Sequence, residues 1–226
     1  HLELPWSDKE LENEIIRTLE SKFWEGESYI RLIITRGVGR IDLMPKTCEE
    51  PNLIVIAKEL PILRAELHEN GLVLCVTDVR RNSRDAMDPG IKSGNYLNNV
   101  LALIEAREKG ADDSVMLNSN DHLTECTTSN IFIVKDGIVQ TPSLECGILP
   151  GITRMKVLEI ARNNRIEVEE TELTLDDLES ADEIFITGTI KGVVPVKQII
   201  GHADWEGVRG PVTERLRELF YEIAGM

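Results

Sequence analysis

Three segments of the sequence carry groups that could act together on one small, charged ligand. Lys92 follows a Pro-Gly break, and Glu125 lies in a threonine-rich stretch between strands. Either residue alone is unremarkable, because most lysines and glutamates are solvated surface residues. The segment Leu149-Pro150-Gly151-Ile152-Thr153-Arg154 adds a helix start whose free N–H groups and threonine hydroxyl suit an anion such as a phosphate. Thr187-Gly188-Thr189, at the end of an expected buried strand, is a second such candidate.

The composition favours a folded protein that binds neither nucleic acid nor membrane. The 226 residues are 42% hydrophobic and 29% charged, which is ordinary for a globular chain. Twenty-five Lys and Arg against forty Asp and Glu give a net charge of −15, whereas phosphate-rich partners need clustered positive charge. No apolar run approaches the length of a membrane span, and the first residues lack a signal pattern.

The cysteines and histidines favour a cytoplasmic protein without a metal site. The four cysteines lie far apart, with no Cys-x-x-Cys pair, as is typical of reduced thiols rather than a disulfide framework. None of the four histidines has metal-ligand spacing with another. We therefore expect neither a zinc site nor a Ser-His-Asp hydrolase.

The elements that must position these groups are predicted from the spacing of the apolar residues. Helices are expected from Ser7 to about Trp24, from Asn95 to near Gly110, after Pro150-Gly151 and from Pro211. Strands are expected at 29–35, 53–57, 71–77, 115–117, 130–134, 138–140, near 168, at 183–187 and at 193–200. Hairpins without a regular strand–helix alternation favour an α+β fold over a doubly wound sheet.

Four segments, in this order along the chain, resemble the class IV aminotransferases, which are the fold-type IV pyridoxal-phosphate enzymes. These segments are Ile91 through Leu97, Thr124-Glu125 with Ser129 through Phe132, Leu149 through Arg154, and Ala181 through Thr189 with Pro195-Val196. The resemblance implies a small N-terminal α/β domain at residues 1–80 whose front part is missing. It further implies an interdomain loop at 81–90, a large cofactor-binding domain at 91–226 with a mixed, β-barrel-like sheet and helices, and a homodimer.

The resemblance gives the matching residues roles around pyridoxal 5′-phosphate. Lys92 is similar to the Schiff-base lysine, whose freed amine serves as general base and acid. Glu125 resembles the carboxylate that keeps the pyridine nitrogen protonated. The other implied contacts are Tyr96 at the phenolic oxygen, Leu149 at a ring face, Ile152, Thr153 and Thr189 at the phosphate, and Gly151 and Gly188 within the same cofactor-binding segments. Arg154 is expected to fix its helix by a salt bridge, and Cys126 to be a small buried residue.

Two parts of the resemblance favour a branched-chain substrate. Tyr29-Ile30-Arg31 is similar to the Tyr-x-Arg strand of branched-chain aminotransferases, whose arginine helps to accept a carboxylate. Thr187-Gly188-Thr189 is closer to that subgroup than to aminodeoxychorismate lyase. The backbone of Thr189 and Ile190 is similar to the part that meets the α-carboxylate of the substrate.

Other residues depart from the branched-chain pattern. Arg40 resembles a carboxylate-binding arginine of D-amino-acid aminotransferases, with Asp42 in place of the partner histidine. Lys92 and Tyr96 have the D-amino-acid type of spacing, and Lys191 replaces a small residue.

The sequence therefore predicts a pyridoxal-phosphate-dependent aminotransferase. It would move an amino group between an amino acid, preferably of branched-chain type, and 2-oxoglutarate. D-amino-acid transamination and aminodeoxychorismate lyase activity stay open, because both use the same lysine. A non-catalytic scaffold is disfavoured, since a scaffold needs neither Lys92 nor Glu125.

Overall fold

The chain forms two compact units in the computed structural model, which describes residues 4–60, 69–207 and 209–225. The units are His1–Ile62 and Leu63–Met226. This division differs from the predicted interdomain loop at 81–90. The reason is strand β3 (Leu72–Val76), which precedes that loop and yet pairs with β4 (Asp113–Leu117) and β10 (Gly192–Ile200) of the second unit.

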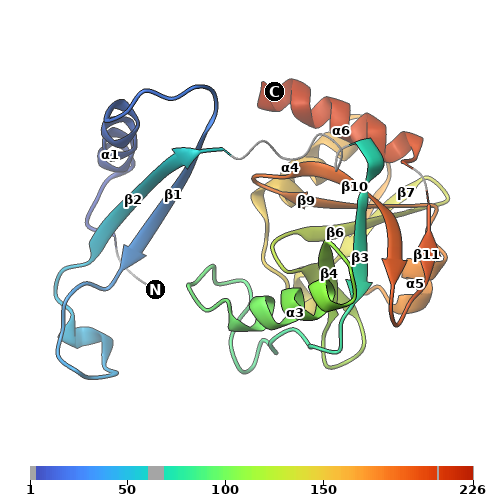
Figure 1. The fold of residues 1–226 in the computed structure, drawn as a ribbon, viewed down its shortest axis with the longest axis horizontal. Helices are drawn as coiled ribbons and strands as arrows, with labels where there is room; N and C mark the ends of the chain where they lie inside the picture. Colours follow the sequence, from blue (N-terminus) through green and yellow to red (C-terminus); the bar gives the residue numbers. More distant parts are fainter. Residues whose placement is uncertain (1–3, 61–68, 208, 226) are drawn as a thin grey trace. The chain divides into compact units, whose positions relative to one another are not determined.

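In its described residues, the first unit contains one α-helix, a short 3₁₀ helix and a two-stranded sheet (Figure 1). Helix α1 (Asp8–Glu20) begins at a capping box, in which the Ser7 hydroxyl accepts from the N–H of Glu10 and the Glu10 carboxylate accepts from the N–H of Ser7. Strands β1 (Ser28–Thr35) and β2 (Asn52–Glu59) pair antiparallel. All three elements overlap the ranges predicted from the sequence.

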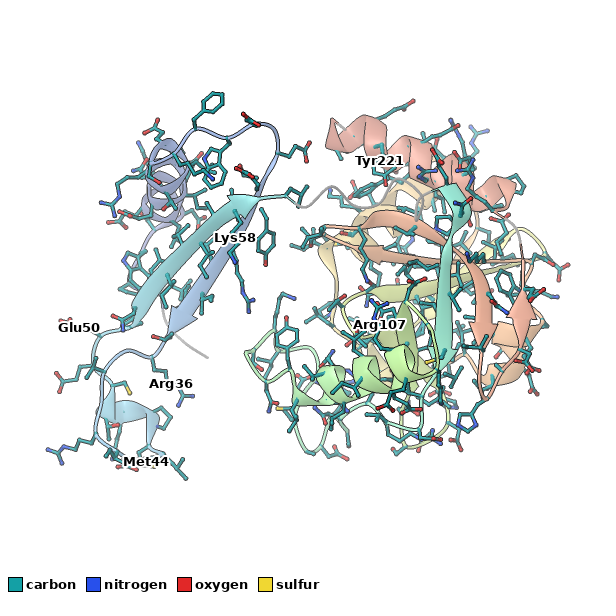
Figure 2. All side chains as sticks on the ribbon, in the orientation of Figure 1. Arg36, Met44, Glu50, Lys58, Arg107 and Tyr221 are labelled. Atoms are coloured by element: carbon teal, nitrogen blue, oxygen red, sulfur yellow. The ribbon has the colours of Figure 1, made fainter. Side chains whose placement is uncertain are left out.

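The connection between β1 and β2 is long and irregular. It contains the short 3₁₀ helix η1 (Pro45–Thr47), and Figure 2 shows Arg36, Met44 and Glu50 along it. No described residue of this first unit is fully buried. The buried core of the described chain therefore lies in the second unit.

The second unit is built on a nine-stranded mixed sheet, against which its helices pack. After β3, its elements in chain order are α3 (Leu97–Glu108), β4, β5 (Leu123–Cys126), β6 (Asn130–Lys135), β7 (Ile138–Pro142), η2 (Leu144–Cys146), α4 (Ile152–Asn163), β8 (Val168–Thr171), α5 (Leu175–Glu179), β9 (Glu183–Gly188), β10, β11 (Trp205–Glu206) and α6 (Pro211–Ala224). Of these strands, only β5 and the short β11 were not predicted from the sequence.

The sheet closes on itself. Strands β10, β3, β4, β5 and β6 are neighbours in that order, and β9 pairs with both β6 and β10. This double pairing completes a barrel, from which β7 and β8 extend on one side and β11 on the other. The predicted α+β class with a barrel-like sheet is confirmed.

The alternation of side chains along each strand divides the core into two clusters. On β6, Ile131 and Ile133 join the cluster to which all six barrel strands contribute, so this cluster fills the barrel. Phe132 and Val134 point the other way and pack beneath α4 and α6, where Phe132 stacks on Phe185 of β9 with ring centroids 4.7 Å apart. Strand β6 is buried on both faces for this reason, and it reads as a continuous apolar run.

The helices cover different parts of the barrel. Helix α6 lies against β9, β10 and α4, whereas α3 lies against β3 and β4 (Figure 1). No helix within the described ranges is long and apolar enough to cross a membrane.

Antiparallel pairing brings three polar segments to one end of the barrel. Glu125 at the end of β5 pairs with Asn130 at the start of β6, and Asn130 in turn pairs with Thr187 near the end of β9. The turn 127–129 and the turn 189–191 are therefore neighbours. The start of β4, at Asp113, lies at the same end because β4 runs antiparallel to β5.

Candidate active site

A pocket of about 130 Å³ opens at this end of the barrel. It is lined by the loop before α3, the turns 127–129 and 187–189, and the start of α4. All nine residues predicted to bind a cofactor line it, namely Lys92, Tyr96, Glu125, Leu149, Gly151, Ile152, Thr153, Gly188 and Thr189. The fold thus brings together segments that are up to about a hundred residues apart in sequence.

Glu125 is a buried carboxylate whose two oxygens have several partners. Arg81 Nη2 lies 2.8 Å from Oε1, and the backbone N–H of Leu149 donates to Oε2 at 3.0 Å. Burial raises the pKa of the Glu125 carboxyl, while Arg81, the Leu149 N–H and the charge of Lys92 act in the opposite direction. A carboxylate of this kind suits a partner that carries a proton on a ring nitrogen.

Asn130 joins Glu125 to the start of α4. Its Nδ2 donates to Glu125 Oε2 at 3.3 Å and to the carbonyl of Leu149 at 3.0 Å. A Cβ on Gly151 would lie only 2.1 Å from Asn130 Oδ1, so residue 151 must be glycine if Asn130 keeps this position. The glycine of the Pro150-Gly151 break therefore allows the helix start to approach the carboxylate.

The start of α4 is open to a ligand. Its N-cap is Gly151, and no side chain caps the first turn among the described residues. The N–H groups of Ile152 and Thr153 thus lie at a helix N-terminus beside the Thr153 hydroxyl, in the wall of the pocket. This arrangement agrees with the predicted anion site.

Thr187 supplies another polar group to the pocket. Its side chain is 1% exposed, and its Oγ1 has no hydrogen-bond partner among the described residues. Such a buried hydroxyl can bond a polar group that enters the pocket.

Lys92 reaches the pocket from the loop that precedes α3. This loop turns at Asp88, whose side chain accepts from the N–H of Gly90 and whose carbonyl accepts from the N–H of Ile91. Tyr96 is the N-cap residue of α3 and lines the same pocket. An exposed lysine and a buried glutamate thus line one cavity, as general acid–base chemistry requires.

The predicted substrate residues are divided between the two units. Tyr29 and Arg31 are two apart on β1, so their side chains share one face of that strand. Arg40 is exposed in the connection after β1. Thr189 lines the pocket, and Ile190 follows it in the turn without lining the pocket. Their roles in substrate binding stay predictions.

Two residues of the site were not recognised as such from the sequence. Arg81 stood in a loop with two other arginines, Arg80 and Arg84, and no spacing marks which of them is buried. Asn130 belongs to a segment that carries the resemblance, but the sequence pattern assigned it no role beyond the start of a strand. The available signal was physical: a buried carboxylate needs a cation and N–H donors, and these could only come from residues near it in space.

Two predictions of structural rather than catalytic roles, for Arg154 and Cys126, are confirmed. The Nη2 of Arg154 lies 2.9 Å from Glu170 Oε2 and donates to the carbonyl of Pro142 at 2.9 Å, so Arg154 ties α4 to the sheet. Cys126 is 1% exposed, and burial raises the pKa of its thiol well above the ordinary value. Cys126 is a buried structural residue rather than a nucleophile.

Known proteins match nearly the whole chain. The family model described as Amino-transferase class IV matches residues 1–199. A protein of Methanocaldococcus jannaschii described as a candidate branched-chain-amino-acid aminotransferase is 40% identical over 222 residues, which are 98% of this chain and 76% of that protein. The D-alanine aminotransferase of Listeria monocytogenes is 35% identical over 98% of this chain and 75% of its own.

The chain belongs to the class IV aminotransferase family. Its fold agrees, since the branched-chain amino acid aminotransferase of Escherichia coli superposes with a TM-score of 0.91 at 31% identity, over 98% of this chain and 73% of that one. An aminotransferase from Brucella abortus bound to the cofactor pyridoxal phosphate has a TM-score of 0.86 at 28% identity, over 100% and 78% of the two chains. The predicted family of pyridoxal-phosphate-dependent transaminases is confirmed.

Replacing Arg81 tests the electrostatics of the site. Arg81→Met leaves Glu125 buried without its cation, and we expect the free energy of unfolding near neutral pH to fall by about 3–5 kcal/mol. The substitution raises the pKa of Glu125 further in the folded state only. The folded variant then binds more protons than the folded wild type, so the loss should grow as the pH rises and shrink as it falls.

Urea denaturation at several pH values measures this effect. Arg84→Met is the matched control, because Arg84 pairs with the exposed Glu145. This substitution should lower the free energy of unfolding by less than about 1 kcal/mol at any pH. A loss for Arg81→Met that is the same at every pH would contradict the assignment.

Proposed function

We propose that this chain moves an amino group between a branched-chain amino acid and 2-oxoglutarate, with pyridoxal 5′-phosphate as cofactor. One observation carries the proposal: the amine of Lys92, the buried carboxylate of Glu125 and the uncapped start of α4 all line one pocket. A ligand with an aldehyde, a basic ring nitrogen and a phosphate matches these three groups one by one.

The donor set fits that cofactor. Lys92 provides the amine that binds an aldehyde, and Glu125 the negative charge for a protonated ring nitrogen. The N–H groups of Ile152 and Thr153 and the unpartnered hydroxyl of Thr187 suit a phosphate. Tyr96 and Leu149 would contact the ring, and Gly151, Gly188 and Thr189 would lie beside the phosphate.

The chain's own residues then provide the proton chemistry. When bound, the cofactor supplies an electron sink for the charge that develops at the substrate Cα. Glu125 would stabilise a proton on the ring nitrogen, because Arg81 and the N–H of Leu149 hold its carboxylate in place. The amine of Lys92 would take the proton from the substrate Cα and deliver it to the cofactor carbon that is bonded to the transferred nitrogen.

A branched-chain substrate is supported by the relatives from M. jannaschii and E. coli and by Tyr29 and Arg31 on one face of β1. The resemblance gives Arg31 the role of accepting a substrate carboxylate, and it gives the backbone of Thr189 and Ile190 that of meeting the α-carboxylate. The Listeria relative favours D-amino-acid transamination as the second candidate, in which Arg40 would bind the carboxylate. Aminodeoxychorismate lyase activity would use the same Lys92.

We also propose that the chain forms a homodimer. Helix α3 carries an apolar stripe on its outer face, whose residues are between 47% and 66% exposed: Leu97, Val100, Leu101 and Ile104. These positions recur at the helical period and form one continuous patch. An exposed patch of this kind marks an interaction surface, and a second copy of the chain would cover it.

Free thiols support a cytoplasmic location for the protein. Cys75, Cys126 and Cys146 are buried and free in the structure. Burial raises the pKa of the Cys75 thiol to about 11, so this thiol stays protonated and unreactive at neutral pH.

Replacing Lys92 tests the proposed function. The purified protein should show a visible absorption band of the lysine-bound cofactor that disappears on borohydride reduction. Lys92→Ala should lack this band and transaminate more slowly by a factor of about 10² to 10⁴. Lys197→Ala removes an exposed lysine of β10, and this variant should keep the visible band and the wild-type rate of transamination. A normal band in Lys92→Ala would refute the role of this lysine.

An amino-acid panel tests the substrate. L-Leucine should change the visible spectrum and form glutamate from 2-oxoglutarate, whereas D-alanine should do neither. Arg31→Met should raise the KM for 2-oxoglutarate about tenfold through loss of a charged hydrogen bond, and Arg40→Met should leave it near wild type. The reverse pattern selects the D-amino-acid candidate, and pyruvate released from aminodeoxychorismate selects the lyase.

Sedimentation measures the proposed dimer. The wild-type chain should sediment at twice its own mass, and Leu101→Asp with Ile104→Asp should sediment as a monomer, because two charges would be buried in the contact. Ile223→Asp on α6 is the control, since Ile223 is 69% exposed outside the stripe, and it should stay dimeric. A wild-type monomer would rule the dimer out.

A further inference from the structure

A second ion pair, between a buried aspartate and a partly exposed lysine, lies behind the wall of the pocket. Asp113, at the start of β4, has a side chain that is 3% exposed, and its Oδ2 lies 2.8 Å from the Nζ of Lys191. Its Oδ1 accepts from the N–H of Ser114 and from both the N–H and the hydroxyl of Thr127. The carboxylate is therefore fully bonded, and Lys191 neutralises its charge.

Lys191 connects the two turns that form this wall. It lies in the turn between β9 and β10, directly after Thr189 and Ile190. Besides Asp113, its ammonium donates to Thr128 Oγ1 at 3.3 Å and to Ser129 Oγ at 3.1 Å. An ammonium has three N–H groups, and Lys191 directs each of them to a different acceptor.

These bonds determine what the two hydroxyls can offer to the pocket. Each hydroxyl oxygen accepts from the Lys191 ammonium, so its own O–H is left to donate. Thr128 and Ser129 both line the pocket, and within the described residues neither O–H has an acceptor. A cation behind a hydroxyl also makes that hydroxyl a stronger donor, because bonds in such a chain polarise one another.

We propose that Lys191, anchored on Asp113, orients the Thr128 and Ser129 hydroxyls as donors to an anionic group in the pocket. The inference rests on the proposed function, in which two anions enter this pocket: the cofactor phosphate and the substrate carboxylate. Both have the oxygen chemistry that two hydroxyl donors recognise. Lys191 is thus a positioning residue that acts through Thr128 and Ser129.

The experiment compares each ligand that carries the anionic group with a counterpart that lacks only that group. Lys191→Met removes the charge and keeps the length of the side chain. It should weaken the binding of pyridoxal 5′-phosphate to the cofactor-free protein about tenfold but not that of pyridoxal, if the anion is the phosphate. If the anion is the carboxylate, Lys191→Met should instead weaken the binding of L-leucine to the cofactor-loaded protein but not the binding of 3-methylbutylamine.

Three further variants keep the test decisive. Lys191→Arg retains the charge and should bind the affected anion more tightly than Lys191→Met. Lys197→Met is the matched control on the exposed side of β10 and should bind all four ligands as the wild type does. Thr128→Val with Ser129→Ala leaves the ion pair intact and should lose the same anion affinity. This double variant tests whether the two hydroxyls bind the anion, even if Lys191→Met does not fold.

Two results would overturn the inference. One is wild-type affinity for both anions in Lys191→Met and in the double variant. The other is an equal loss of affinity for the ligands with and without the anionic group, which a purely structural role would give. Either result in a wild-type protein that shows the visible band refutes this inference alone, whereas a wild-type protein without the band refutes the proposed function.

Discussion

The carboxylate of Glu125, buried at the end of a barrel, places the strongest physical demand on the active-site region. A charge out of water is costly unless cations and N–H donors surround it. Here Arg81, the Leu149 N–H and Asn130 meet that demand, and each comes from a different segment. The same contacts join the loop before α3, strand β6 and the start of α4. Compensation of one charge therefore also assembles the walls of the pocket.

Closure of the sheet makes this assembly possible. Strand β9 pairs with β6 and with β10, so the ends of β5, β6 and β9 are held at one edge within the spacing of neighbouring strands. The barrel interior is filled with mostly aliphatic side chains, whereas polar groups gather at its end, where the pocket opens. The packed apolar barrel thus positions the turns that carry the ligand-binding groups, as is usual for functional loops.

Local cations in this protein act against a strongly acidic background. The net charge is −15, yet two buried carboxylates near the pocket, Glu125 and Asp113, each have a basic partner in Arg81 and Lys191. The Arg81–Glu125 pair is shielded from solvent on both sides and Asp113 is buried in the other, so salt screens these pairs less than it screens pairs of surface charges. Recognition of an anionic ligand in such a chain depends on a few placed donors rather than on the overall field.

The sequence by itself determined most of the secondary structure, the family and nine of the residues that line the pocket. Periodicity and turn residues located most strands and helices, because these signals are local. The motifs around Lys92, Glu125 and Gly151 predicted residues that line one pocket. Strand β5, the partner role of Arg81 and the contacts of Lys191 were decided only by the tertiary structure. Pairing across the barrel and the burial of charge join residues distant in sequence, and no local pattern records which arginine or lysine will be the one enclosed.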